Sequence, residues 1–279
     1  MTKKKSEPFS HPIDGSEIKI STRIENAVPD VFDPNKPRLG RRESEPHSAE
    51  VTYIHDVLTT NFPEGRAVWD LHHYFLGRKG ALEGKEIDVQ FDVSFFKDLK
   101  IAYTLSSYDA RKYEGRIPDM AINVLSRSTW SKDLSETVDI CKDLGISIYV
   151  VFSPYEVTSN IYNPPFLSVF ILKEDESYQQ KDLHNITLKE RETIDEKNII
   201  AVSDKLPFRL GLMRLKHHHE GEQPLFRLIF IDPSEPRILL SKAEKDKQEA
   251  EAKAKEAEAK VKELEKNLVK YRKKFGELD

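Results

Sequence analysis

The sequence contains little cysteine, no long apolar run and none of the short motifs that bind common cofactors. Its single cysteine, Cys141, excludes a disulfide framework and is typical of a reducing compartment. No Gly-rich phosphate loop and no Cys/His zinc spacing occurs. The first residues, MTKKKSEPFSHP, lack the apolar segment of a secretory signal, and no later apolar run approaches the roughly 18 residues of a membrane span. We therefore expect a soluble, cytoplasmic protein with no membrane association.

Positive charge is also scarce where a nucleic-acid-binding protein would need it. The chain carries a formal net charge of −4, and residues 48–241 contain 23 Lys and Arg against 30 Asp and Glu, a net charge of −7. Proteins bind the phosphate backbone by replacing its counterions with Lys and Arg. This balance argues against tight, non-specific DNA binding, although a locally basic cleft is still compatible with it.

Composition predicts one domain with an appendage at each end. Hydrophobic residues make up 38% of the chain and charged residues 33%, which is a low ratio for a compact globule. Six of the 15 prolines fall in residues 1–47, and proline at that density interrupts helices and central strands. We therefore expect an extended or disordered lead over 1–47, a folded domain over 48–240 and a helix over 241–279.

The first part of the domain predicts a helix followed by two antiparallel strands. The helix spans 48–62, and the strands span 66–76 and 87–96 with a Gly- and Lys-rich turn between them. On the second strand, alternation places polar residues on one face: Asp88, Gln90, Asp92 and Ser94. A strand face that is wholly polar indicates either solvent or a functional site.

The stretch from 115 to 155 organises the rest of the prediction. It reads as a strand that begins at Pro118-Asp119, a polar turn, a helix capped by Ser131 and ended by Gly145, and a second strand over 146–152. Such a unit places its two strands parallel in one sheet. Further strands are predicted at 166–172 and in a hairpin formed by 206–215 and 225–232.

The end of the chain carries a heptad repeat. Apolar residues alternate spacings of four and three over about four heptads, with Glu and Lys between them: Ala250, Ala254, Ala257, Val261, Leu264, Leu268, Tyr271, Phe275 and Leu278. We expect this helix to form a coiled coil, so that the protein self-associates through residues 250–278. The alternative is a single solvated helix.

Several segments together resemble a known nuclease family. They are FDVSFF at 91–96, PDMAINVLSRSTWSKDL at 118–134, LGISIYVVFSPY at 144–155, and LGLMRL with LFRLIFIDP within 210–233. Over residues 48–279 the chain is similar to a divergent member of the Uma-type family of restriction endonucleases, in the PD-(D/E)XK nuclease superfamily. The resemblance implies an α/β (α+β, mixed-sheet) fold with a restriction-endonuclease-like core and a C-terminal coiled-coil helix.

The resemblance also implies a site and its chemistry. In this family two carboxylates on adjacent strands bind Mg²⁺ or Mn²⁺, which activates a water, and a lysine stabilises the developing charge. Asp92 matches the first acid. Asn123 stands at the position of the second acid, and Thr137 stands at or near the position of the lysine.

These departures put catalysis in doubt, because affinity for a divalent cation depends on the number of charged ligands. Asp119 shares the face of Asn123 and is a further candidate metal ligand, so the metal set is Asp92, Asp119 and Asn123. Arg127 and Lys132, in the turn after the strand, are candidates for the missing positive charge. The catalytic set is therefore Asp92, Asn123, Arg127 and Lys132.

Three hypotheses follow for the function. The chain is a Mg²⁺-dependent DNA endonuclease with a weakened or rebuilt site, which hydrolyses phosphodiester bonds if it is active. Alternatively, it is a non-catalytic oligomeric module that binds nucleic acid or protein, or a purely structural oligomer. The residue at 123 favours a catalytically impaired protein.

Overall fold

The computed structural model describes residues 44–127, 129–157, 162, 164–184, 186, 198–202, 205–215 and 223–276. Its elements are, in chain order, α2 (Glu45–Asn61), β1 (Arg66–Leu76), the 3₁₀ turn η1 (Gly80–Leu82), β2 (Glu86–Phe96), β3 (Tyr108–Asp109), the 3₁₀ turn η2 (Ala110–Tyr113), β4 (Met120–Val124), α3 (Trp130–Asp133), α4 (Glu136–Leu144), β5 (Ile148–Ser153), β6 (Phe166–Leu172), β7 (Tyr178–Leu183), β8 (Ile199–Ala201), β9 (Arg209–Arg214), β10 (Phe226–Ile231) and α5 (Lys242–Phe275).

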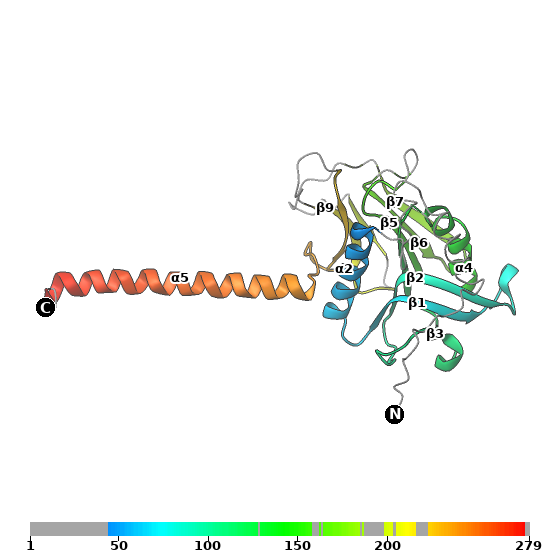
Figure 1. The fold of residues 1–279 in the computed structure, drawn as a ribbon, viewed down its shortest axis with the longest axis horizontal. Helices are drawn as coiled ribbons and strands as arrows, with labels where there is room; N and C mark the ends of the chain where they lie inside the picture. Colours follow the sequence, from blue (N-terminus) through cyan, green and yellow to red (C-terminus); the bar gives the residue numbers. More distant parts are fainter. Residues whose placement is uncertain are drawn as a thin grey trace, which may run out of the picture.

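Two sheets and their covering helices form the globular part (Figure 1). The larger sheet has seven strands in the order β3-β1-β2-β4-β5-β6-β7, and the smaller one has three in the order β10-β9-β8. The pairs β1–β3 and β4–β5 are parallel, whereas the other pairs in the larger sheet are antiparallel. The fold is therefore a mixed α+β fold, as the sequence predicted.

The strand pair and the hairpin predicted from the sequence are confirmed. β1 and β2 pair antiparallel from Arg66↔Phe96 to Leu76↔Glu86, and β9 and β10 pair antiparallel as well. The first helix begins earlier than predicted, at Glu45, because the side chain of Ser44 caps it by accepting a hydrogen bond from the His47 backbone N–H. The strand β7 was not predicted, since its residues are mostly polar and lie at an edge of the sheet.

The unit from 115 to 155 has the predicted parallel strands, but the single helix expected between them is wrong. β4 pairs with β5 in register Asn123↔Val151. Between them α3 ends after one turn, and α4 starts at Glu136 after Ser135, whose backbone is not helical (φ −132°, ψ −85°). Gly145 ends α4 in the left-handed region (φ +84°), as predicted.

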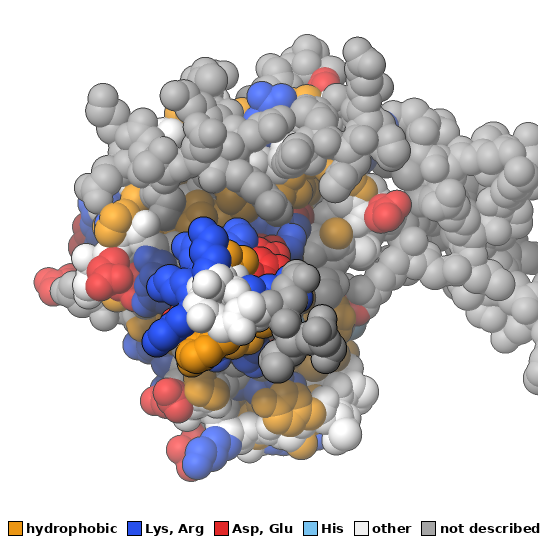
Figure 2. Space-filling model, turned by 90° about the vertical axis from the view of Figure 1, so that its left-hand side faces the viewer, with side chains coloured by type: hydrophobic (Ala, Val, Ile, Leu, Met, Phe, Trp, Pro, Cys, Tyr) orange, Lys and Arg blue, Asp and Glu red, His pale blue; other side chains and the backbone are white. Residues whose placement is uncertain are grey.

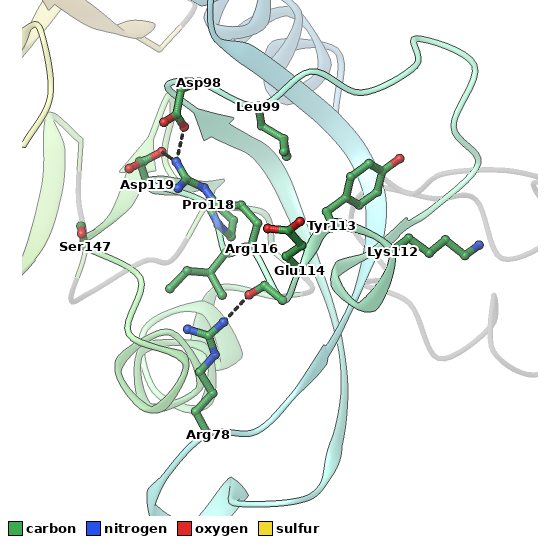
Figure 3. A pocket seen from close by; sticks show the side chains of 12 residues that line it. Arg78, Asp98, Leu99, Lys112, Tyr113, Glu114, Arg116, Pro118, Asp119 and Ser147 are labelled. Atoms are coloured by element: carbon green, nitrogen blue, oxygen red, sulfur yellow. Dashed lines mark hydrogen bonds and ion pairs between the residues drawn. The ribbon is translucent and has the colours of Figure 1, made fainter.

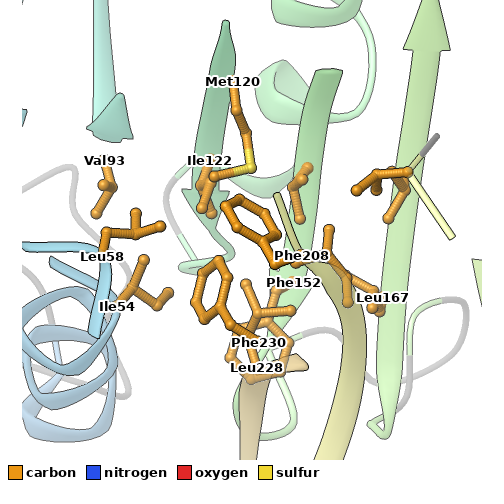
Figure 4. Packing of buried hydrophobic residues seen from close by; sticks show 14 of the residues in the cluster. Ile54, Leu58, Val93, Met120, Ile122, Phe152, Leu167, Phe208, Leu228 and Phe230 are labelled. Atoms are coloured by element: carbon orange, nitrogen blue, oxygen red, sulfur yellow. The ribbon is translucent and has the colours of Figure 1, made fainter. Parts of the chain in front are cut away.

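The two faces of β4 supply two separate hydrophobic cores. Met120, Ile122 and Val124 face α2 and the smaller sheet, and pack there with Leu58 and Phe208 (Figure 4). The opposite face packs against α4: Ala121 and Leu125 join a cluster that includes Cys141 and Leu144. Because every residue of β4 is buried, this strand is the centre of the domain.

The C-terminal helix α5 projects from the globular part as a single rod (Figure 1). Its 34 residues span about 51 Å. Ser241 and Glu244 form a capping box at its start, and every residue from 246 to 276 is exposed. Within the described residues, no helix is long and apolar enough to cross a membrane.

A polar junction fixes the start of α5 to the domain. Arg227 on β10 donates to Glu50 on α2 (Nε–Oε1 3.0 Å), lies 3.9 Å from the centroid of the Tyr53 ring, and approaches Glu244 on α5 (3.9 Å). Asp56 of α2 also accepts a hydrogen bond from the first backbone N–H of α5, at Lys242 (3.0 Å). Burial raises the pKa of Glu50 to about 7, while the adjacent guanidinium opposes this rise.

We predict that Arg227→Met destabilises the protein by about 3–5 kcal/mol, because it leaves Glu50 buried without its cation. The double variant with Glu50→Gln should recover much of this loss, since no charge then remains buried. Denaturant unfolding at neutral pH measures both changes. The control is Arg237→Met, which removes an exposed pair with Asp232 and should cost less than about 1 kcal/mol. Equal losses at the two arginines would contradict the prediction.

Candidate functional site

Polar side chains gather where β4 ends and the chain turns toward α3. We call Asp92, Asn123, Ser126, Thr129 and Asp133 the Asn123 cluster. Asn123, Ser126 and Asp133 are each 5% exposed, so three polar side chains are buried within one short segment. Buried polar groups are costly unless they are hydrogen-bonded, and the cluster shows how this cost is met.

The backbone pairing of β2 and β4 ends at the cluster and is continued by side chains. The last paired residues are Val93 and Ile122. Beyond them, the Val124 backbone N–H donates to Asp92 Oδ2 (2.7 Å), and the Asp92 backbone N–H donates to Asn123 Oδ1 (3.4 Å). The first-acid residue and the second-acid residue of the predicted site therefore lie side by side on adjacent strands. Each of them contributes a hydrogen bond that holds the strands together.

The other end of the Asn123 amide is held by Asp133. Asn123 Nδ2 donates to Asp133 Oδ1 (2.7 Å), and the Thr129 hydroxyl donates to Asp133 Oδ2 (2.7 Å). The Thr129 hydroxyl is also 2.9 Å from the Ser126 hydroxyl. Both carboxylate oxygens of Asp133 are thus engaged within the protein, and so are both ends of the amide.

The charge state of Asp133 reflects its burial. The pKa of Asp133 is raised to about 6, chiefly by loss of solvation; the nearby charge of Asp92 also raises it, while the hydrogen bonds from Thr129 and Asn123 lower it. The charge of Asp92 therefore acts on the Asp133 carboxyl across the cluster. Asp133 reaches the cluster from the single-turn helix α3 and not from a strand.

His47 closes the cluster from the side of α2. It is 2% exposed, and its Nε2 lies 3.4 Å from Asp92 Oδ2. The same Asp92 oxygen accepts the Val124 backbone hydrogen bond, so two groups of this chain occupy its surroundings. The carboxylate is left with 22% of its side-chain surface exposed.

The other residues considered for the site come from the turn after β4 and from the two helices that follow it. Arg127 is partly buried in the turn between β4 and α3, and Lys132 is exposed on α3. Thr137, which the resemblance places at or near a lysine position, is 2% exposed in the first turn of α4. A buried threonine brings no positive charge to the site.

Asp119, predicted as a metal ligand, lies at the opposite end of β4. Its backbone N–H donates to the Phe95 carbonyl, four residues before Asn123, which corresponds to about 13 Å along a strand. Its carboxylate accepts from the Lys97 backbone N–H (2.9 Å) and lies 3.4 Å from Arg116 Nη2. The structure therefore does not bring Asp119 together with Asp92 and Asn123.

Asp119 belongs instead to a cavity of about 680 Å³ at that end of the sheet. Figure 3 shows Arg116 directed at both Asp119 and Asp98, and Arg78 bonded to the Gly115 carbonyl. The cavity is lined by three cations and three anions: Arg78, Lys112, Arg116, Asp98, Glu114 and Asp119. Because the two signs balance, the lining favours neither an anionic nor a cationic ligand.

The donors at the Asn123 cluster do not fit the Mg²⁺ that the family resemblance implies. Mg²⁺ requires near-octahedral coordination by oxygen, with carboxylates as its usual protein ligands. Here Asn123 and Asp133 direct their polar atoms at one another, and Asp92 is the one carboxylate in the cluster that retains solvent exposure. Among the residues that the structure describes, no group of three or more His, Cys, Asp or Glu is placed to hold a metal ion.

Comparison with known proteins gives a likeness to solved structures alone. No protein-family model matches the chain, and no curated protein matches it. Among solved structures, the chain is similar to one described as a "putative nuclease belonging to DUF820" from Anabaena variabilis. The identity is 15% and the TM-score 0.36, over 55% of this chain and 74% of that one. At this level of similarity the site has to be judged on its own geometry.

Sequence reasoning missed His47 and Asp133. His47 was assigned to the lead because of the nearby prolines, yet Ser44 followed by Pro46 is a signal for a helix start. Asp133 was treated as part of a regular helix, in which it would face solvent. No local signal identifies its role, because its contact with Asn123 depends on α3 ending after one turn.

We predict that Asp133→Asn changes the pH dependence of stability. A raised pKa contributes stability that is fully present below the ordinary value of 3.8 and is lost as pH rises through about 6. The variant lacks this titration, so relative to wild type it should gain up to about 3 kcal/mol of unfolding free energy between about pH 4 and pH 7. Denaturant unfolding of both proteins across this range measures the difference in unfolding free energy. Glu50 titrates in both proteins, so its contribution cancels in the difference.

The matched control is Asp139→Asn, which alters an exposed carboxylate on α4. Its stability difference from wild type should change little over the same pH range. A flat difference for Asp133→Asn as well would show that the Asp133 carboxyl titrates normally in the folded protein.

Proposed function

We propose that this chain is a nuclease-fold protein that does not hydrolyse phosphodiester bonds and acts as a non-catalytic, self-associating binding module. The hydrogen-bonded state of Asn123 carries the proposal. The residue at the position of the second acid is neutral, buried and bonded at both ends of its amide. A metal ion would have to break these bonds, and it would gain one charged ligand, Asp92, that is exposed to solvent.

The arrangement of elements supports the nuclease-fold part of the proposal. The family resemblance implied a helix, an antiparallel strand pair with an acidic face, and a strand–helix–strand unit. The structure contains α2, the pair β1–β2, and β4–α4–β5, with these strands adjacent in the order β1-β2-β4-β5. Asp92 and Asn123 lie on neighbouring strands, where the family keeps its two acids.

One observation favours a second candidate, an endonuclease that uses Mg²⁺ or Mn²⁺. The charge of Asp92 raises the pKa of Asp133, so a second carboxylate does lie near the first. In this candidate Asp133 would rotate away from Asn123 and serve with Asp92, and DNA would be the substrate. The net charge of −7 over residues 48–241 still argues against tight, non-specific binding to DNA.

We predict that the purified protein does not cleave supercoiled plasmid in Mg²⁺ or Mn²⁺. The double variant Asn123→Glu with Thr137→Lys restores both missing family groups, so it should gain cleavage that Asp92→Ala then abolishes. Because both positions are buried, circular dichroism must first show that the double variant is folded. Thermal unfolding with and without Mn²⁺ provides a separate readout, since only a protein that binds the ion is stabilised by it.

The cleavage assay on the wild-type protein decides between the two candidate functions. Cleavage that is lost in both Asp92→Ala and Asp133→Asn, but retained in Asp88→Ala, would establish the endonuclease. Asp88 is a suitable control because it is a carboxylate on the same strand, β2, but is exposed.

Self-association through residues 250–278 is the second part of the proposal, and α5 supports it. The apolar residues of the predicted repeat are strongly exposed on this helix, including Leu264 (67%), Tyr271 (65%) and Phe275 (69%). Exposed apolar side chains in a continuous stripe mark an interaction surface. Leu278 lies outside the described residues.

We predict that Leu268→Glu dissociates the oligomer into monomers of 32.3 kDa. A buried glutamate in the seam would lose its solvation without gaining a partner. The matched control is Val269→Glu, because Val269 is equally exposed (52% against 53%) but lies outside the repeat. Light scattering at several concentrations gives the masses. Monomers for wild type and both variants would show that α5 is a single solvated helix.

A further inference from the structure

The exposed apolar residues of α5 follow one heptad register. Of six large apolar side chains that are exposed on this helix, five fit the repeat: Val261, Leu264, Leu268, Tyr271 and Phe275. The spacings assign Val261, Leu268 and Phe275 to a positions, and Leu264 and Tyr271 to d positions. A β-branched residue at a with leucine at d favours two strands, which is the pattern of Val261 and Leu264.

At the start of α5, the globular domain does not cover the a and d positions of the repeat, which we call the seam. Ala243 and Lys247 continue the d and a positions toward the domain, and both are exposed. Glu244 and Lys245, on a different side of the helix, are partly covered. The domain therefore contacts α5 beside the seam and not on it, so a second helix can approach along the whole length.

The charges beside the seam determine the direction in which a second copy can pair. In this register Lys253 and Lys260 occupy g positions, and Glu258 and Glu265 occupy e positions. In a parallel pair each g residue faces the e residue of the next heptad on the other helix. Lys253 then faces Glu258 of the second copy and Lys260 faces its Glu265, which gives four opposite-charge pairs in a dimer against the two like-charge pairs that Asp246 and Glu251 form at the start of α5.

An antiparallel pair would reverse this pattern. In that arrangement g positions face g positions and e positions face e positions, so lysines would oppose lysines and glutamates would oppose glutamates. Like charges held at such positions destabilise the pair. We propose that α5 pairs with α5 of a second copy in a parallel, in-register coiled coil; this inference rests on the proposed self-association.

Repulsion between the basic C-terminal ends of the two α5 helices opposes the parallel arrangement only weakly. Five cations and no acid occur between 266 and 276: Lys266, Lys270, Arg272, Lys273 and Lys274. Figure 2, which looks along α5 from its C-terminal end, shows Lys and Arg side chains gathered at this tip. Three of them fall at the outward c and f positions, where salt screens repulsion over about 8–10 Å. The helix dipole also favours cations at a C-terminus.

A disulfide test distinguishes the two directions in the full chain. The only native cysteine, Cys141, is buried and is first replaced by Cys141→Ala. Ala250→Cys then places a thiol at a d position near the root of α5, and Ala252→Cys places one at an outward f position as the control. Mild oxidation should join two copies of Ala250→Cys several-fold faster than two copies of Ala252→Cys.

The expected difference follows from geometry. In an in-register parallel pair the two residues 250 face one another, within the roughly 7 Å between Cα atoms that a disulfide requires. In an antiparallel pair aligned over residues 250–275 they would be about 38 Å apart. A dimer by light scattering without cross-linking of Ala250→Cys would overturn the parallel pairing and leave self-association intact. A monomeric wild-type protein would overturn both.

A charge test supplies an independent measurement. Lys253→Glu with Lys260→Glu turns the four attractive pairs of a parallel dimer into repulsive ones and should raise the dimer dissociation constant about tenfold or more. The control is Lys255→Glu with Lys262→Glu, which makes the same change of net charge at b positions. Equal effects of the two double variants would contradict the parallel pairing, because an antiparallel dimer merely exchanges Lys–Lys for Glu–Glu contacts.

Discussion

The candidate site depends on the two hydrogen bonds of the Asn123 side-chain amide. An asparagine side chain can accept at its oxygen and donate at its nitrogen, whereas a carboxylate can only accept. At this position the oxygen receives the Asp92 backbone N–H and the nitrogen donates to Asp133. A glutamate or aspartate could not make both contacts, since it would face Asp133 with a second negative charge. The amide therefore makes the buried cluster compatible with folding in the absence of a cation.

The rest of the domain holds this amide in place. β4 lies in the middle of the larger sheet, and its side chains alternate between a core covered by α2 with the smaller sheet and a core covered by α4. Asn123 lies on the α4 face at the end of the strand, where the β2–β4 backbone pairing has stopped. Side-chain hydrogen bonds of the cluster thus take the place of the next backbone pair between β2 and β4. A change in the charge of the cluster would therefore also affect the pairing of these strands.

The globular part and α5 differ in whether their side chains find partners within the same chain. In the domain, even the charged groups at the root of α5 have partners, as Glu50 and Arg227 show. Along α5 beyond the root, the large apolar side chains have most of their surface in water. In the proposed dimer a second helix would cover this stripe, and the charges beside the stripe would select its direction.

Much of the fold could be predicted from local patterns. Alternation along β2 and β4, helical spacing in α2 and α5, and the helix end at Gly145 follow from the preferences of short segments, which do not depend on the rest of the fold. The break between α3 and α4 was not predicted, because Leu134 and Val138 keep helical spacing across it. The polar edge strand β7 was missed because its pairing with β6, and not its composition, makes it a strand.

The resemblance of the sequence to a nuclease family predicted that Asp92 and Asn123 lie on adjacent strands, and the periodicity of the sequence predicted the heptad stripe of α5. Only the tertiary structure decided that His47 and Asp133 meet this pair, since one comes from a helix that begins in the proline-rich segment and the other from a helix of a single turn. It also decided that Asp119 lies elsewhere. Periodicity specifies which face of a helix or strand a residue occupies. Hydrogen bonds between segments that are distant in the sequence depend instead on where the helices and strands begin and end in space.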